Sequence, residues 1–180
     1  MRNFFLGGLS VLLAMLLIAF CIIVVGLFPT NADSPPNGLE RRIANYALNT
    51  SVQRHARRVT NPVGITNENL ISGMKLYTMN CAECHGSLDL QPSALQHSMY
   101  PPPPQLLLQP ISRPEWQTYY SISTGIRYTA MPAWSHTLDD KDIWRITTFL
   151  SSIRDLPVPV QQYWEESYGI SLGKSETHRQ

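Results

Sequence analysis

The sequence predicts an all-α fold, and three observations carry this prediction. Apolar residues recur at three- and four-residue spacing in segments 39–58, 66–81 and 137–153, the spacing that gathers side chains on one helix face. A separate stretch, from Phe4 to Phe28, contains no charged side chain. The length of 180 residues leaves room for one domain of ordinary size plus appendages.

The uncharged stretch from Phe4 to Phe28 is long enough to cross a bilayer. At about 1.5 Å per residue it covers the roughly 30 Å hydrocarbon core. A cleaved signal peptide has a shorter apolar region, of about 7 to 15 residues, and Thr30-Asn31-Ala32 is only a weak cleavage candidate. We therefore expect one transmembrane helix, whose orientation is indicated by little more than Arg2.

Charge is distributed unevenly, although the net charge is only +1 and gives no reason to expect a nucleic-acid partner. Residues 38–60 hold five arginines against one glutamate, whereas residues 61–155 hold eight acidic and six basic side chains. The basic segment is either a solvated linker helix or a docking surface for anionic lipid or an acidic partner.

The most informative motif is Cys81-Ala82-Glu83-Cys84-His85. In an exported protein this C-x-x-C-H pattern indicates covalent attachment of a c-type haem. On a helix the two thiols and the imidazole project from one face. Cys81 and Cys84 would then form thioether bonds to the porphyrin, while His85 would bind the iron as proximal ligand.

Two other kinds of site use a C-x-x-C pair. A zinc site needs four ligands, yet the remaining cysteine of the chain, Cys21, lies in the apolar stretch. A redox-active dithiol is expected within a βαβ pattern, and none is visible around this motif. Haem attachment is therefore the preferred interpretation.

Met131 is the candidate sixth ligand of the iron. It lies 46 residues after His85 in a segment with little periodicity, and Pro132 stiffens the loop that presents it. A thioether is a soft donor suited to low-spin haem iron, and His/Met ligation raises the reduction potential. A core methionine is the alternative. The competing ligands are Met99, His97 and His136.

Residues 86–112 also lack periodicity and contain the run Pro101-Pro102-Pro103-Pro104. We expect a loop that wraps around the haem edge, with a backbone carbonyl accepting a hydrogen bond from the second ring nitrogen of His85. The rival interpretation is an exposed proline-rich peptide ligand.

With both motifs placed, residues 66–153 resemble a class I c-type cytochrome. The resemblance rests on the C-x-x-C-H motif combined with Met131-Pro132, and on Gly73-x-x-x-Tyr77 before it. An aromatic last helix around Trp144 and Phe149 resembles one of the two crossed terminal helices of that family. A close approach of another helix would explain Gly73 within the helix that leads to Cys81.

The resemblance implies one covalent haem c, held by Cys81 and Cys84 and ligated by His85 and Met131. It also implies that Trp116 or Arg127 binds a haem propionate.

We therefore expect four parts: a transmembrane signal-anchor at 1–29, a linker with a basic amphipathic helix at 30–62, a cytochrome c domain at 63–155 and a C-terminal tail at 156–180. The tail is too apolar to be pure disorder and is expected to pack on a partner.

The expected function is single-electron transfer at the periplasmic face of a bacterial cytoplasmic membrane. The partners would be redox proteins, with the chain as a subunit or accessory of a respiratory membrane complex. Coordination filled by His85 and Met131 leaves no open position for catalysis, so an enzyme is not expected. The alternatives are a haem enzyme or gas sensor with a displaceable sixth ligand, and an assembly subunit with a vestigial haem.

Overall fold

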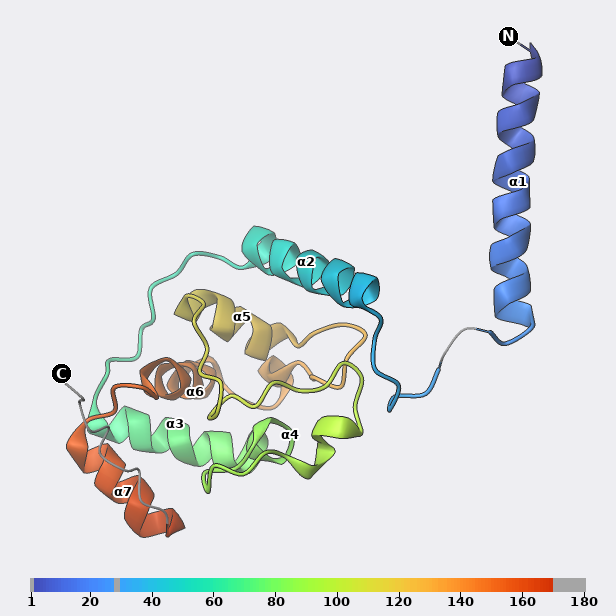
Figure 1. Cartoon of the computed structure of the whole chain (residues 1–180). Helices are drawn as coiled ribbons and strands as arrows, with labels where there is room; N and C mark the ends of the chain where they lie inside the picture. Colours follow the sequence, from blue (N-terminus) through green and yellow to red (C-terminus); the bar gives the residue numbers. More distant parts are fainter. Residues whose placement is uncertain (1, 28–29, 170–180) are drawn as a thin grey trace, which may run out of the picture. The chain divides into compact units, whose positions relative to one another are not determined.

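The computed structural model describes residues 2–27 and 30–169. Every regular element in this part of the chain is a helix, and none is a strand (Figure 1). The all-α prediction is confirmed. The chain divides into two compact units, Met1–Ser34 and Pro35–Gln180. The division of the chain into four parts stays a prediction.

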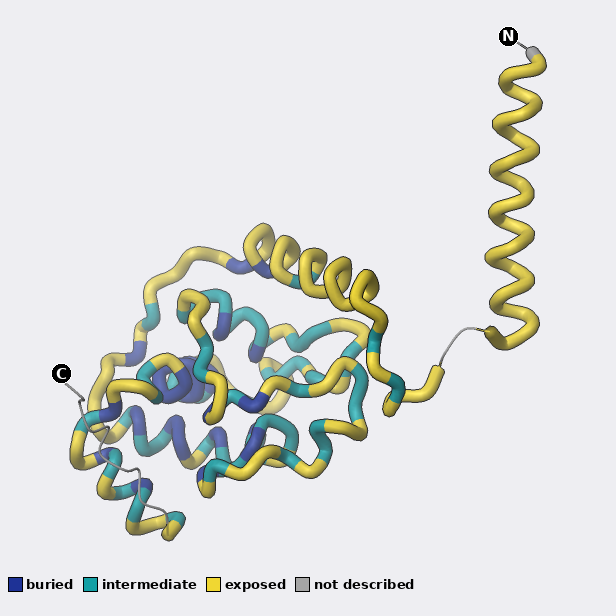
Figure 2. Tube along the Cα trace, in the orientation of Figure 1, coloured by how far each residue is buried: buried dark blue, intermediate teal, exposed yellow. Residues whose placement is uncertain are grey.

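The first unit consists of α1 (Arg2–Val24), whose described side chains are all exposed (Figure 2). Within it, Asn3–Val24 is long and apolar enough to cross a membrane, a test that a signal sequence also passes. Phe28, the end of the predicted span, lies outside the described residues.

The second unit holds the remaining elements. They are α2 (Gly38–His55), α3 (Asn67–Asn80), α4 (Ala82–His85), η1 (Ala94–His97), α5 (Glu115–Thr124), η2 (Trp134–His136), α6 (Asp140–Ser152) and α7 (Val158–Tyr168). Side chains cap the N-termini of two of these helices. The Thr66 side chain accepts from the backbone N–H of Asn69, and the Asp139 carboxylate accepts from that of Asp142.

The crossing of α3 and α6 forms the centre of the core, and Gly73 makes it possible. A Cβ at Gly73 would lie 2.1 Å from the carbonyl oxygen of Arg145 and 3.0 Å from Cβ of Phe149. The rings of Tyr77 and Phe149 then meet beside this contact, with centroids 5.8 Å apart. The expected close helix approach at Gly73 is confirmed.

Helix α7 packs on the same core. Val160 and Trp164 are buried, and the indole N–H of Trp164 donates to the carbonyl oxygen of Leu88 at 2.7 Å. The ring of Trp164 also contacts that of Phe149, with centroids 5.9 Å apart. The expectation that the tail packs on a partner is therefore wrong for residues 158–168, while residues 170–180 lie outside the described part.

Helix α2 lies beside α5 (Figure 1). Of its apolar residues at roughly helical spacing, which are Leu39, Ile43, Tyr46, Ala47 and Val52, only Val52 is buried. The domain contacts α2 through its C-terminal half, where Leu48 and Val52 are one turn apart.

Candidate haem-binding site

A cavity of about 420 Å³ in the second unit brings together all four residues that the sequence predicts to bind haem. Cys81, Cys84 and His85 line it from the end of α3 and from α4, and Met131 lines it from the loop before η2. The rest of its wall is largely apolar, including Pro101 to Pro104, Leu106, Ile111, Ile122, Ile126, Trp134 and Leu150. A large planar apolar group suits this wall.

The C-x-x-C-H segment is helical, as predicted. Cys81 ends α3, with its N–H donating to the carbonyl oxygen of Tyr77 at 2.8 Å, and its own carbonyl accepts from the N–H of His85 at 2.9 Å. Helix α4 thus carries Cys84 and His85, and Cys81 stands at its N-terminal junction with α3.

His85 is oriented by the proline-rich loop. Its Nδ1 lies 2.8 Å from the carbonyl oxygen of Pro104. A carbonyl oxygen can only accept, so Nδ1 carries the proton and Nε2 is left as the free lone-pair donor. Burial lowers the pKa of His85, and the hydrogen bond to Pro104 partly opposes this shift. The net lowering of the pKa favours the neutral imidazole, and the hydrogen bond of Nδ1 leaves Nε2 as the coordinating nitrogen.

Tyr77 fixes the carbonyl groups at the end of the motif. Its buried hydroxyl donates to the carbonyl oxygens of His85, at 3.0 Å, and Gly86, at 2.7 Å. Burial, followed by the charge of the Cys81 thiolate, raises the pKa of Tyr77 above its ordinary value. The phenol therefore stays protonated and remains a donor at neutral pH.

The loop that carries Met131 is held by hydrogen bonds between its own residues. The N–H of Ile126 donates to the carbonyl of Met131 at 3.1 Å, and the N–H of Met131 donates to Oγ1 of Thr129 at 3.0 Å. Gly125 has φ +66°, and a Cβ there would lie 2.8 Å from the carbonyl oxygen of Met131 and 2.6 Å from the carbonyl carbon of Pro132. Glycine is thus required for this turn.

With this geometry described, comparison with known proteins identifies the domain. Residues 68–150 match the family model described as "Cytochrome C oxidase, cbb3-type, subunit III". The second unit contains a class I c-type cytochrome domain. Such a domain implies haem c and haem-based electron transfer.

Among solved structures, one similar chain belongs to the reducing HAO-like protein complex of Kuenenia stuttgartiensis. It is 20% identical, the alignment covers 51% of this chain and 46% of that chain, and the TM-score is 0.44. The search of the curated proteins gave no match.

Of the competing ligands, Met99 lines the haem cavity of the cytochrome domain, whereas His97 and His136 do not. Met99 therefore remains the rival of Met131. It follows η1 in the loop that also carries Pro101 to Pro104.

Gln105 is a site residue that sequence reasoning missed. Its buried side chain donates to the carbonyl oxygens of Pro103, at 3.0 Å, and Cys84, at 3.3 Å, and accepts from the N–H of Ser93 at 2.7 Å. It thus joins the proline-rich loop to the haem motif. A glutamine directly after four prolines is a weak signal, because its partners are backbone groups from elsewhere in the chain.

Three polar side chains with unused hydrogen-bonding capacity line the largely apolar cavity: Asn45 of α2, Arg113 before α5 and Thr118 of α5. Thr118 is buried, and its hydroxyl is the one buried side-chain polar atom within residues 2–27 and 30–169 that lacks a partner. An orphaned buried donor is costly. Haem carries two carboxylates that such donors can bind, so these residues fit the group.

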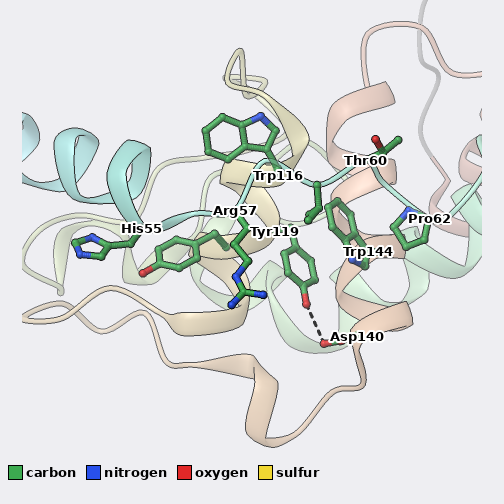
Figure 3. Close-up of a pocket in the computed structure, with 10 residues that line it drawn as sticks. His55, Arg57, Thr60, Pro62, Trp116, Tyr119, Asp140 and Trp144 are labelled. Atoms are coloured by element: carbon green, nitrogen blue, oxygen red, sulfur yellow. Dashed lines mark hydrogen bonds between the residues drawn. The ribbon is translucent and has the colours of Figure 1, made fainter.

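Trp116 and Arg127, the propionate partners implied by the resemblance, do not line this cavity. Trp116 lines a separate pocket of about 520 Å³, which Tyr119 and Trp144 also line, their rings stacked with centroids 4.1 Å apart (Figure 3). Arg58 lies over Trp116, 5.9 Å from the ring centroid. The Trp116 ring thus helps attach the segment after α2 to the domain.

Proposed function

We propose that this chain is a membrane-tethered electron-transfer protein with one covalent haem c. Cys81 and Cys84 would hold the group through thioether bonds, and His85 and Met131 would ligate the iron. The observation that carries this proposal is the shared cavity: all four side chains line it, and His85 is held with Nε2 free.

The haem, when bound, supplies a one-electron Fe(III)/Fe(II) couple. The chain's own residues supply the rest. Pro104 fixes the tautomer of His85, and the apolar wall excludes water from the ring. Thr118, Arg113 and Asn45 are placed to bind the haem carboxylates. With Met131 as a second ligand beside His85, the iron would have no open coordination position, which favours an electron carrier over a haem enzyme or gas sensor.

Burial also suits Cys81 to thioether chemistry. Burial, and then the charge of the Cys84 thiolate, raises the pKa of Cys81 from 9.0 to about 12. A thiolate is thus disfavoured at this position. The uncharged thioether sulfur that replaces it carries no such desolvation cost.

The tether would be α1, with the haem domain on the periplasmic side of a bacterial cytoplasmic membrane. The length and composition of Asn3–Val24 support this assignment. Attachment of haem c outside the cytoplasm supports the orientation. The description of the matching family, a subunit of a cytochrome oxidase, supports a role as a subunit or accessory of a respiratory membrane complex.

The test is the spectrum and topology of the full-length protein. In our proposal the haem stays attached to the denatured chain, the ferric protein is low-spin and shows the weak red band of methionine-bound iron, and alkaline carbonate leaves the protein in the membrane. A high-spin ferric spectrum that changes with added ligands would overturn the carrier assignment in favour of an enzyme or sensor. Release by carbonate would overturn the tether alone.

A further inference from the structure

Helix α2 has two faces of different kinds. Leu48 and Asn45 line the haem cavity and Val52 is buried, so this face packs on the domain. On the opposite side Leu39, Ile43 and Tyr46 are 68%, 60% and 75% exposed. Their i, i+4, i+7 spacing places them in one row about 180° from Leu48. Large apolar side chains are thus turned away from the domain.

Arginines flank this outward row. With about 100° between successive residues, Arg42 lies roughly 60° to one side and Arg54 roughly 60° to the other. Both are exposed. Neither makes an ion pair within the described residues. An apolar row bordered by free cations is the pattern of a helix at the surface of an anionic bilayer.

The chain keeps α2 close to such a surface. Residues 25–37 separate the end of α1 from the start of α2. Fully extended, thirteen residues span at most about 45 Å. If α1 crosses the membrane, α2 cannot leave its vicinity, so a bilayer is the surface that this helix meets most often.

We propose that the outward face of α2, formed by Leu39, Ile43 and Tyr46 with Arg42 and Arg54, binds the surface of an anionic lipid bilayer. This inference rests on the proposed tether. Because the inner face of the same helix lines the haem cavity, docking of α2 fixes how the cavity is oriented to the membrane. The haem domain would then be held in one orientation rather than tumble on its linker.

The test measures the accessibility of single cysteines in the full-length holoprotein. Tyr46→Cys is compared with Val158→Cys on α7, where Val158 is 63% exposed. Both variants also carry Cys21→Ser, so that no other free thiol remains once haem is attached. Each protein is reconstituted into nanodiscs of pure phosphatidylcholine or with added phosphatidylglycerol, and a neutral water-soluble maleimide is applied. An unchanged haem spectrum confirms folding, and Ile43→Cys provides a second reporter.

We expect alkylation at position 46 to slow several-fold with phosphatidylglycerol and to recover in high salt or with Arg42→Gln and Arg54→Gln, while position 158 keeps one rate throughout. Equal rates at positions 46, 43 and 158 in both lipids would overturn the proposal. Protection in native membranes but not in anionic nanodiscs would also overturn it, and would assign the face to a protein partner. Failure of the tether is distinguishable, because carbonate then releases the protein.

Discussion

The carbonyl oxygen of Pro104 lies 2.8 Å from Nδ1 of His85, so a loop 19 residues further along the chain decides which ring nitrogen is available to iron. The carbonyl belongs to the last of four prolines. Residues of this run also line the cavity. The proline-rich loop is therefore part of the haem site, and its exposed-ligand interpretation is not needed.

Removing Gln105 should loosen this loop. Gln105→Ala leaves the N–H of Ser93 and the carbonyls of Pro103 and Cys84 without their side-chain partner. We expect a loss of about 1–3 kcal/mol in the free energy of unfolding of the holoprotein, measured by denaturant titration. Gln109→Ala, at an exposed position of the same loop, is the matched control. Equal effects of the two substitutions would contradict the role given to Gln105.

The α3–α6 crossing should not tolerate a methyl group at Gly73. The added carbon of Gly73→Ala would meet backbone, not a flexible side chain, 2.1 Å away. We expect a loss of about 3 kcal/mol or more, seen as a lower denaturation midpoint or a failure to accumulate holoprotein. Gly64→Ala has its nearest atom 4.0 Å away and should be close to neutral. Similar stabilities of the two variants would show that the helices can separate at little cost.

Substitution can show whether Met131 or Met99 is the sixth ligand of the iron. Met131→Ala should abolish the red band of the ferric protein and lower the reduction potential by on the order of 0.1 V, a fraction of the range that axial ligands span. Met99→Ala should keep the band and nearly the same potential. Potentiometric titration with optical detection measures both. The reverse pattern would assign the sixth ligand to Met99.

Tyr77→Phe tests the phenol that binds the end of the haem motif. Loss of its hydrogen bonds to His85 and Gly86 should cost about 1–3 kcal/mol at neutral pH. Since burial raises the pKa of Tyr77 above 10.0, the native state favours the protonated phenol. Its contribution is complete below pH 10 and declines as the pH rises further.

The control for this prediction is built into the pH dependence. Between pH 9 and pH 11, roughly one unit on each side of the ordinary pKa, stability of Tyr77→Phe should fall less than that of the parent protein. Parallel profiles from denaturant titration would show that Tyr77 does not titrate differently in the native and unfolded states.

Thr118→Val tests whether the buried Thr118 hydroxyl binds a haem carboxylate or has no partner. If Oγ1 donates to a haem carboxylate, the substitution should destabilise the holoprotein by about 1–3 kcal/mol, because a buried acceptor loses its donor. Ser121→Ala is a useful comparison, since its hydroxyl lines the same cavity but donates to the carbonyl of Gln117 at 2.9 Å. A neutral or stabilising Thr118→Val would remove Thr118 from the haem site.

Structural features that depend on neighbouring residues along the chain could be predicted from the sequence. The helices around residues 66–81 and 137–153 and the close approach at Gly73 follow from local spacing or from a missing side chain. The sequence also named the four candidate haem-binding residues that the fold brings to one cavity, although ligation itself stays a prediction.

Long-range partners were not predictable in this way. Gln105 and Trp164 bind backbone carbonyls, which every residue carries, so no pattern in the sequence marks the partner. The face of α2 that packs on the domain could not be predicted, because leucine and isoleucine on both sides of a helix give no unique stripe. At these positions tertiary packing, not the local sequence, determines which groups are in contact.

Burial of Cys81 has a consequence for the order of biogenesis. Only 8% of this residue is exposed in the finished fold, so its thiol is out of reach of an enzyme that would join it to haem. Synthesis delivers the motif about 80 residues before Trp164, the side chain that closes the core over the following loop. Cofactor attachment is therefore expected before Cys81 is buried in this fold, and a chain that folds too early would mature poorly.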